Sequence, residues 1–157
     1  MKTINWKSLL VSLAISLGAG VLGNIVGGNR DGQYEQLYQP SLAPPGWVFP
    51  IVWTILFILM GIAAYLIYES DSPEKKEALG IYAAQLIANI GWSLIFFGLD
   101  AYLLAFAWIL LLWYLIFLTW QSFRKINKTA GWLLVPYLAW VTFATYLNLA
   151  IAIHYYF

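Results

Sequence analysis

Five stretches without a charged side chain divide the sequence. Each can supply the roughly 20 apolar residues that cross a hydrocarbon core about 30 Å thick. Because lipid offers the backbone no hydrogen bonds, each stretch should form an α-helix. The pattern therefore predicts an all-α integral membrane protein, one domain over residues 1–157 with a loop at 27–45. The expected transmembrane helices cover approximately residues 6–26, 46–68, 75–98, 101–123 and 130–154.

Short polar segments mark the ends of these helices. The chain should turn at Gly98-Leu99-Asp100, because the apolar runs on either side are together too long for one crossing. The segment Asp71-Ser72-Pro73-Glu74 has an N-cap candidate followed by a proline suited to a first helical turn, so it opens the third helix. Pro45 and Pro50 are the candidates for the start of the second helix.

The basic residues predict the direction of the chain across the membrane. The N-terminus and the second and fourth loops hold all but one of the 8 lysines and arginines, and the first loop has only Arg30. The positive-inside rule then places the N-terminus in the cytoplasm and the C-terminus outside, together with the loop at 27–45.

The first helix has an alternative interpretation. The stretch MKTINWK followed by SLLVSLAISLGAG resembles the basic and apolar regions of a secretory signal. Against cleavage, a stripe of small or polar residues recurs at every fourth position, which predicts a helix-packing face that a removed signal does not need. The stripe consists of Ser8, Ser12, Ser16, Gly20, Asn24 and Gly28.

The composition agrees with a membrane protein and excludes several functions. The chain is 62% hydrophobic and 10% charged, against about a quarter charged in soluble domains. A net charge of +1 provides no basic field for nucleic acid. Without cysteine and with one histidine, the chain offers little for a metal site, and we expect none. No carboxylate pair or activated nucleophile lies within a span, so no conventional catalytic set is predicted.

Polar and aromatic side chains inside the spans are the candidate functional residues. Gln85, Asn89, Trp92 and Phe96 share one face of the third helix. The amides could simply bond neighbouring helices, or the face could form the wall of a pocket. Similar stripes hold Trp53, Phe57, Met60 and Ala64 on the second helix, and Tyr137, Trp140, Ala144 and Asn148 on the fifth.

The three stripes together suggest a cavity for a flat aromatic ligand. Trp53, Trp92 and Trp140 lie deeper than interfacial tryptophans usually do, and Ala144 leaves room beside them. Pro136 should bend the fifth helix or free a carbonyl group, which could widen such a space.

Three sequence blocks carry a family resemblance. The first runs Tyr34-x-x-Leu37-x-x-Pro40-x-x-x-Pro44-Pro45-Gly46-x-x-Phe49-Pro50-x-x-Trp53 and continues to Leu59-Met60-Gly61. The second is Gln85-Leu86-x-x-Asn89-x-x-Trp92-Ser93-x-x-Phe96-Phe97, and the third is Leu134-x-Pro136-Tyr137-Leu138-Ala139-Trp140-x-x-Phe143-Ala144-Thr145-Tyr146-Leu147-Asn148. In these blocks the chain resembles the TspO/MBR family of tryptophan-rich sensory proteins, also called translocator proteins or peripheral-type benzodiazepine receptors.

The resemblance implies a pocket on the side of the first loop that binds porphyrins, haem and benzodiazepine-type ligands, with no required cofactor. It also implies a homodimer and an integral membrane location, for which we expect a bacterial plasma membrane. In bacterial members, light-dependent porphyrin breakdown is tied to tryptophans that match Trp53 and Trp140. The implied ligand contacts are Tyr34, Pro44, Trp53, Phe57, Asn89, Trp92, Ser93, Trp140, Ala144 and Leu147.

Some residues depart from the family pattern. Gln39 replaces a common lysine, and Gln33-Tyr34 replaces a Trp-Tyr pair, so the electrostatics of the loop should differ. No basic residue follows Tyr146, which argues against sterol binding, although such patterns are weak.

Four functions remain open on the sequence. Tetrapyrrole binding with a sensing or stress-regulating role leads, and light-dependent porphyrin breakdown is the enzymatic alternative. Transport of tetrapyrroles or sterols lacks the support of inverted repeats. A scaffold would use the small-residue stripe of the first helix as a dimer interface.

Overall fold

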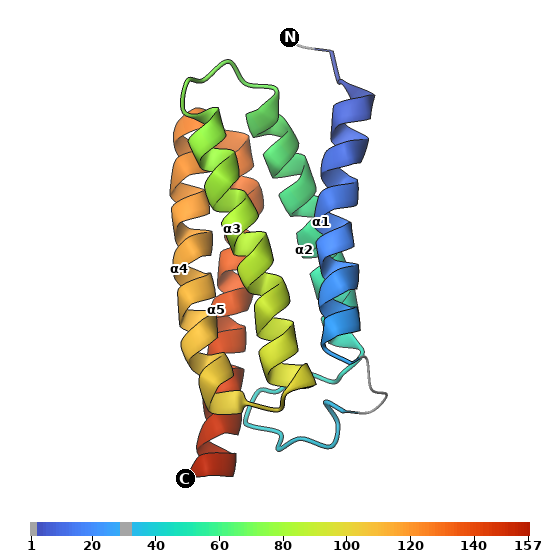
Figure 1. The fold of residues 1–157 in the computed structure, drawn as a ribbon, viewed down its shortest axis with the longest axis vertical. Helices are drawn as coiled ribbons and strands as arrows, with labels where there is room; N and C mark the ends of the chain where they lie inside the picture. The colour runs from blue at the N-terminus through green and yellow to red at the C-terminus, as the bar shows by residue number, and fades with distance from the viewer. Residues whose placement is uncertain (1–2, 29–32) are drawn as a thin grey trace.

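The computed structural model describes residues 3–28 and 33–157. Within these ranges it contains five helices long and apolar enough to cross a membrane, and no β-strand. Lys2, Arg30 and the rest of 29–32, which entered the charge count and the loop prediction, lie outside the described residues. The helices are α1 (Trp6–Val26), α2 (Val48–Tyr68), α3 (Lys75–Ser93) with the π-helical extension η1 (Leu94–Gly98), α4 (Tyr102–Ile126) and α5 (Lys128–Tyr156) (Figure 1).

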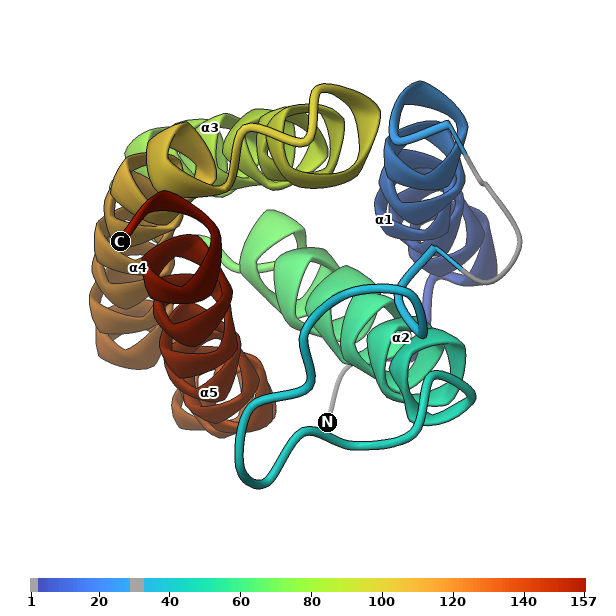
Figure 2. The same ribbon diagram turned by 90° about the horizontal axis from the view of Figure 1, so that it is seen from below.

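The helices form a closed bundle. In chain order they alternate in direction, so the N-terminus and the C-terminus lie at opposite ends (Figure 1). The most extensively packed pairs are α1 with α2 and α3, α4 with α3 and α5, and α2 with α5. Viewed along its length, the bundle is closed at one end by the loop between α1 and α2, which crosses from α1 toward α5 (Figure 2).

The α1–α2 loop ends in a turn rather than at a proline-initiated helix. Val48 donates its backbone N–H to the carbonyl of Pro45 at 3.1 Å, and Trp47 is the N-cap of α2. Pro50 is the third residue of the helix, where its missing N–H leaves no carbonyl unsatisfied. The prediction that α2 starts at Pro45 or Pro50 was therefore wrong, because this turn delays the helix to Val48.

The third span changes its helical type before it ends. A single helix over 75–98 was predicted, but α3 stops at Ser93 and η1 continues to Gly98. Leu99 donates its backbone N–H to the carbonyl of Leu94 at 2.9 Å, a π-helical hydrogen bond. The expected turn follows, with Asp100 at a φ of 51°.

α4 and α5 are both longer than predicted. α4 ends at Ile126, and only Asn127 separates it from α5. The Asn127 side chain accepts a hydrogen bond from the backbone N–H of Ala130 at 3.1 Å, a regular N-cap that starts α5 at Lys128. α5 then continues through Pro136 to Tyr156.

The small-residue stripe of α1 packs inside the bundle. The hydroxyl groups of Ser12 and Ser16 donate to the carbonyl oxygens of Gly61 and Phe57, each at 2.7 Å. A β-carbon built on Gly20 would lie 2.8 Å from the Phe57 ring. The predicted packing face is therefore confirmed, and at these positions it contacts α2 of the same chain.

Candidate ligand site beneath the α1–α2 loop

The loop is anchored to the C-terminal part of α5. The Tyr146 hydroxyl donates to the carbonyl of Ser41 at 2.7 Å, and the Tyr155 hydroxyl accepts from the backbone N–H of Tyr38 at 3.1 Å. The Tyr38 ring also stacks on His154, with 4.1 Å between ring centroids and 5° between planes. These contacts hold the loop across this end of the bundle (Figure 2).

Tyr34 closes the loop on itself. Its hydroxyl donates to the carbonyl of Pro44 at 2.8 Å. Partial burial and, to a smaller extent, the nearby Glu35 carboxylate raise the pKa of Tyr34 above its usual 10.0. Tyr34 is therefore protonated at neutral pH and can donate this bond.

The two glutamines that depart from the family pattern hold the loop in place through hydrogen bonds. The Gln39 amide donates to the carbonyls of Tyr34 and Leu37 at 2.9 and 3.0 Å. The Gln33 amide donates to the carbonyl of Phe97 at 2.8 Å, which ties the loop to η1.

Aromatic rings lead from the loop to the interface of α2 and α5. Tyr34 contacts Phe49 edge-on at 4.6 Å between centroids, and Phe49 contacts Trp140 at 5.6 Å. Deeper in the bundle, Trp53 lies 6.2 Å from Tyr137 and 5.7 Å from Phe57. The structure thus brings together four of the predicted contacts, Tyr34, Trp53, Phe57 and Trp140, in one aromatic region.

The Trp140 indole forms no hydrogen bond with any described residue. Its Nε1 atom is buried, yet it has no partner among the residues that the structure describes. Buried polar groups are nearly always satisfied. Trp140 also lines a cavity of about 450 Å³ on the outer face of the α2–α5 interface, with Pro136 on the same wall. The other lining residues are Val52, Ile55, Leu56, Ala139 and Phe143.

Asn89 belongs to a polar network inside the bundle. Its amide donates to the Tyr137 hydroxyl at 2.7 Å, and that hydroxyl donates to the side-chain oxygen of Gln85 at 2.7 Å. Both amide side chains are buried. The packing interpretation of these amides is therefore confirmed, and the network also fixes the ring against which Trp53 packs.

Trp92 lies in a different cluster from the other two indoles. Its N–H donates to the Asn148 side chain at 2.9 Å, and Asn148 donates to the carbonyl of Tyr102 at 2.9 Å. The Trp92 ring stacks on Phe96 at 5.1 Å. Within 3–28 and 33–157, no ring contact joins Trp92 to Trp53 or Trp140.

The remaining predicted contacts surround this region. Ser93 faces α1, since a β-carbon built on Gly23 would lie 3.4 Å from its Oγ. Ala144 and Leu147 are buried on the inner face of α5, and Pro44 is half-buried in the loop.

Two features of the site were missed on the sequence. Phe49 stood in the family block but had no assigned role, although it joins Tyr34 to Trp140. The stack of Tyr38 on His154 gave no sequence signal, because the partners come from distant parts of the chain and share no motif.

A bundle of five membrane-crossing helices with an aromatic region under an anchored, proline-rich loop defines a multi-pass integral membrane protein with a candidate ligand site. The profile of the TspO/MBR family matches residues 11–154, and the chain belongs to this family.

Named relatives agree with this assignment. The chain is 46% identical over 120 residues to the "Tryptophan-rich protein TspO" of Chlorobaculum tepidum, which covers 75% of this chain and 76% of the relative. It is 36% identical over 145 residues to the "Tryptophan-rich sensory protein" of Cereibacter sphaeroides, with coverages of 92% and 89%. It is also 36% identical over 140 residues to the "Translocator protein" of Homo sapiens, with coverages of 87% and 83%.

Proposed function

We propose that this protein binds a flat, hydrophobic ligand of the porphyrin or haem type beneath the α1–α2 loop and acts as a sensor or regulator of such molecules. The observation that carries the proposal is the buried, unpartnered indole N–H of Trp140. A donor that the protein leaves unsatisfied costs stability, and an acceptor on a ligand would remove that cost.

The surrounding rings support a planar ligand. Phe49 and Trp140 meet edge-on at 66°, and Trp53 meets Tyr137 at 73°, so ring faces in this region are not all covered by each other. An added aromatic pair contributes about 0.5–1.5 kcal/mol beyond its buried area. Benzodiazepine-type ligands are also apolar and aromatic and would use the same contacts.

The scarcity of histidine in this chain favours recognition of the porphyrin ring over recognition of a bound metal ion. His154 is the one histidine of the chain, and its ring is stacked on Tyr38. We therefore propose that metal-free protoporphyrin binds about as tightly as haem.

Titration with protoporphyrin in darkness tests the site. Trp53→Phe and Trp140→Phe should each weaken binding by about 5- to 30-fold, which corresponds to one or two kcal/mol. Trp132→Phe is the matched control on α5, because Trp132 is 73% exposed. If both pocket variants bind like wild type, the proposed site is wrong.

Light-dependent breakdown of the bound porphyrin is a second candidate. Trp53 and Trp140 favour it, because both indoles would lie against a ligand in this region. Loss of porphyrin absorbance only under illumination, reduced in Trp140→Phe at saturating ligand, would support it. Equal loss of porphyrin absorbance in Trp132→Phe and Trp140→Phe would indicate nonspecific photodamage.

We further propose a bacterial plasma membrane location, in line with the Chlorobaculum and Cereibacter relatives. Transport of tetrapyrroles or sterols remains an alternative, for which a flux assay in liposomes is the test. A homodimer, as the family resemblance implies, would need a surface other than the part of the α1 stripe that packs on α2.

A further inference from the structure

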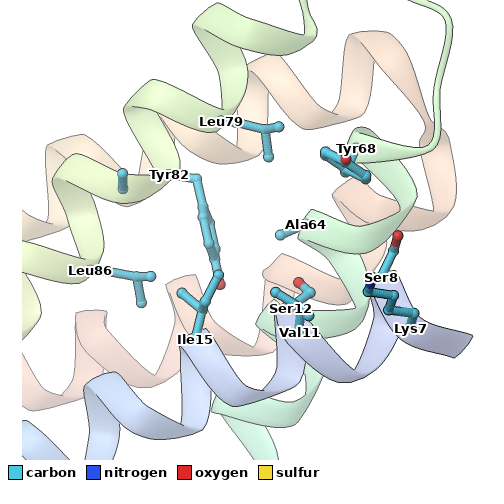
Figure 3. Close-up of a pocket in the computed structure, with 11 residues that line it drawn as sticks. Lys7, Ser8, Val11, Ser12, Ile15, Ala64, Tyr68, Leu79, Tyr82 and Leu86 are labelled. Carbon is cyan, nitrogen blue, oxygen red and sulfur yellow. The ribbon is translucent and has the colours of Figure 1, made fainter.

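A second cavity lies at the opposite end of the bundle from the loop. It has a volume of about 570 Å³ and lies between α1, α2 and α3 (Figure 3). Ligand pockets typically have volumes of about 300–1,000 Å³. This cavity is separate from the site proposed above, which is formed mainly by α2 and α5. Its lining residues are Lys7, Ser8, Val11, Ser12, Ile15, Ala64, Tyr68, Leu79, Tyr82, Ala83 and Leu86.

The cavity exists because α1 and α3 separate. Near the loop the two helices are in contact, where a β-carbon built on Gly23 would lie 3.4 Å from Ser93 Oγ. Toward the N-terminal end of α1 they diverge, and α2 is visible between them (Figure 1). The small side chain of Ala64 on α2 leaves the space open. Val11 and Ile15 on one rim are more than half exposed, so the cavity opens to the lipid-facing surface.

Tyr82 places an unsatisfied polar group in the wall of this cavity. The side chain extends from α3 toward α1 (Figure 3), and the residue is only 5% exposed. Its hydroxyl is buried and makes no hydrogen bond within the described ranges. The nearby Ser16 hydroxyl directs its one proton toward the carbonyls of Phe57 and Leu13, at 2.7 and 3.2 Å, and it forms no hydrogen bond with Tyr82 in either direction.

The mouth of the cavity carries one lysine side chain. Lys7 lies on the first turn of α1 at the rim (Figure 3), and its ammonium group forms no ion pair with any described residue. Lys75 and Lys76 begin α3 at the same end of the bundle but lie between Glu74 and Glu77, so Lys7 is the charged residue that lines the cavity. This charge favours an anionic group at the rim.

We propose that the cavity binds an oxygenated fatty acid, an acidic amphiphile with a hydroxyl or keto oxygen along its chain. The carboxylate pairs with Lys7, the alkyl chain lies between α1 and α3, and the chain oxygen bonds to the Tyr82 hydroxyl. Ile15, beside the end of the Tyr82 ring in Figure 3, is eight residues from Lys7, or about 12 Å along α1. The two polar contacts are therefore far enough apart to require a long chain with a second polar group.

Ricinoleate and oleate provide the matched test, because they differ only by a mid-chain hydroxyl. Binding is measured by equilibrium dialysis of the full-length protein in phosphatidylcholine nanodiscs, with empty nanodiscs subtracted. Ricinoleate should bind about tenfold more tightly than oleate, as one hydrogen bond to a buried group predicts. Tyr82→Phe should abolish this difference in affinity. Lys7→Gln should weaken the binding of both acids but not the binding of methyl ricinoleate.

Three controls separate this site from a folding defect and from the porphyrin site. Tyr82→Phe removes an unsatisfied hydroxyl, so its thermal stability should equal or exceed that of wild type. Ala83→Trp fills the cavity from an exposed position and should abolish ricinoleate binding. Trp140→Phe should leave ricinoleate binding unchanged even if porphyrin binding fails.

Equal affinities of wild type for ricinoleate and oleate would overturn the proposal. Ricinoleate binding that survives in Ala83→Trp would also overturn it, because the ligand would then lie elsewhere.

Discussion

Trp92 and Trp140 carry the same side chain in different hydrogen-bonding states. The Trp92 N–H is bonded to Asn148, whereas the Trp140 N–H has no partner in the described part of the chain. A satisfied indole stabilises the bundle, whereas an unsatisfied buried one needs an acceptor, which a ligand could supply. We therefore propose that Trp92 acts chiefly in the fold and Trp140 in ligand binding.

Replacement of Asn148 should destabilise the protein. Asn148→Ala leaves the Trp92 N–H and the Tyr102 carbonyl without the bonds that Asn148 makes to them. Each lost buried partner costs about 1–3 kcal/mol, so unfolding in detergent should move to clearly lower denaturant concentration. Leu149→Ala, on the same helix at a 37% exposed residue, is the control and should change stability less. Equal midpoints for the two variants would contradict the structural role of this network.

The contribution of Tyr34 should depend on pH only under alkaline conditions. Its raised pKa means that the folded protein favours the protonated phenol. The resulting stability is complete below the ordinary value of 10.0 and is lost as the pH rises through the higher folded value. The ratio of porphyrin affinities of wild type and Tyr34→Phe should stay constant from neutral pH up to that range. A ratio that changes near neutral pH would show that another group controls the loop.

At the residue scale, the sequence could place side chains on a common face but could not identify their partners. Helical spacing put Asn89 and Trp92 on one side of the third span. Their polar groups are bonded to Tyr137 and Asn148, which lie 48 and 56 positions further along the chain. Periodicity within one helix contains no information about such contacts.

At the element scale, the existence of the helices could be predicted because lipid requires the backbone to be helical. Their exact ends and helical type could not, because these depend on local hydrogen bonds. The charge-free runs defined all five spans. The start of α2 at Val48 depends on the turn at Pro45, and η1 depends on a shift to π-type hydrogen bonds near Leu94. Apolar sequence does not distinguish these bonds from regular α-helical ones.

The contact of α1 with α2 should tolerate no extra atom at Gly61. A β-carbon there would lie 2.7 Å from Ser16 Oγ and 3.1 Å from the backbone Cα of Leu13, so the helices would have to separate. Gly61→Ala should reduce the free energy of unfolding by about 1–3 kcal/mol, as overpacking usually does. In contrast, a β-carbon on Gly18 has no neighbour within 4 Å, so Gly18→Ala should be neutral or stabilise the helix by up to about 1 kcal/mol. Denaturant unfolding of both variants tests these expectations. A Gly61→Ala protein as stable as wild type would contradict the close contact.

At the scale of the whole molecule, the topology places the described basic residues at one end. Lys7, Lys75, Lys76 and the basic residues around Asn127 lie opposite the α1–α2 loop (Figure 1). The number of spans and the family could be predicted from the sequence. The packing of α2 on α5, which brings Phe49 to Trp140, required the structure.

Cysteine labelling should give the orientation of the chain. The protein has no cysteine, so Ser41→Cys in the loop and Lys76→Cys at the other end each introduce a single thiol. In intact spheroplasts, a membrane-impermeant maleimide should label Ser41→Cys and should reach Lys76→Cys only after permeabilisation. Labelling in the reverse pattern would place the loop in the cytoplasm.

The most direct test of the central claim is the indole N–H region of the NMR spectrum during a protoporphyrin titration in darkness. The nine tryptophans give separate reporters, and Trp140→Phe assigns the critical signal by its disappearance. The Trp140 N–H should show one of the largest shifts as it gains an acceptor or a ring neighbour, whereas the exposed Trp132 should not move. A saturated complex in which the Trp140 signal is unchanged would show that the ligand binds elsewhere.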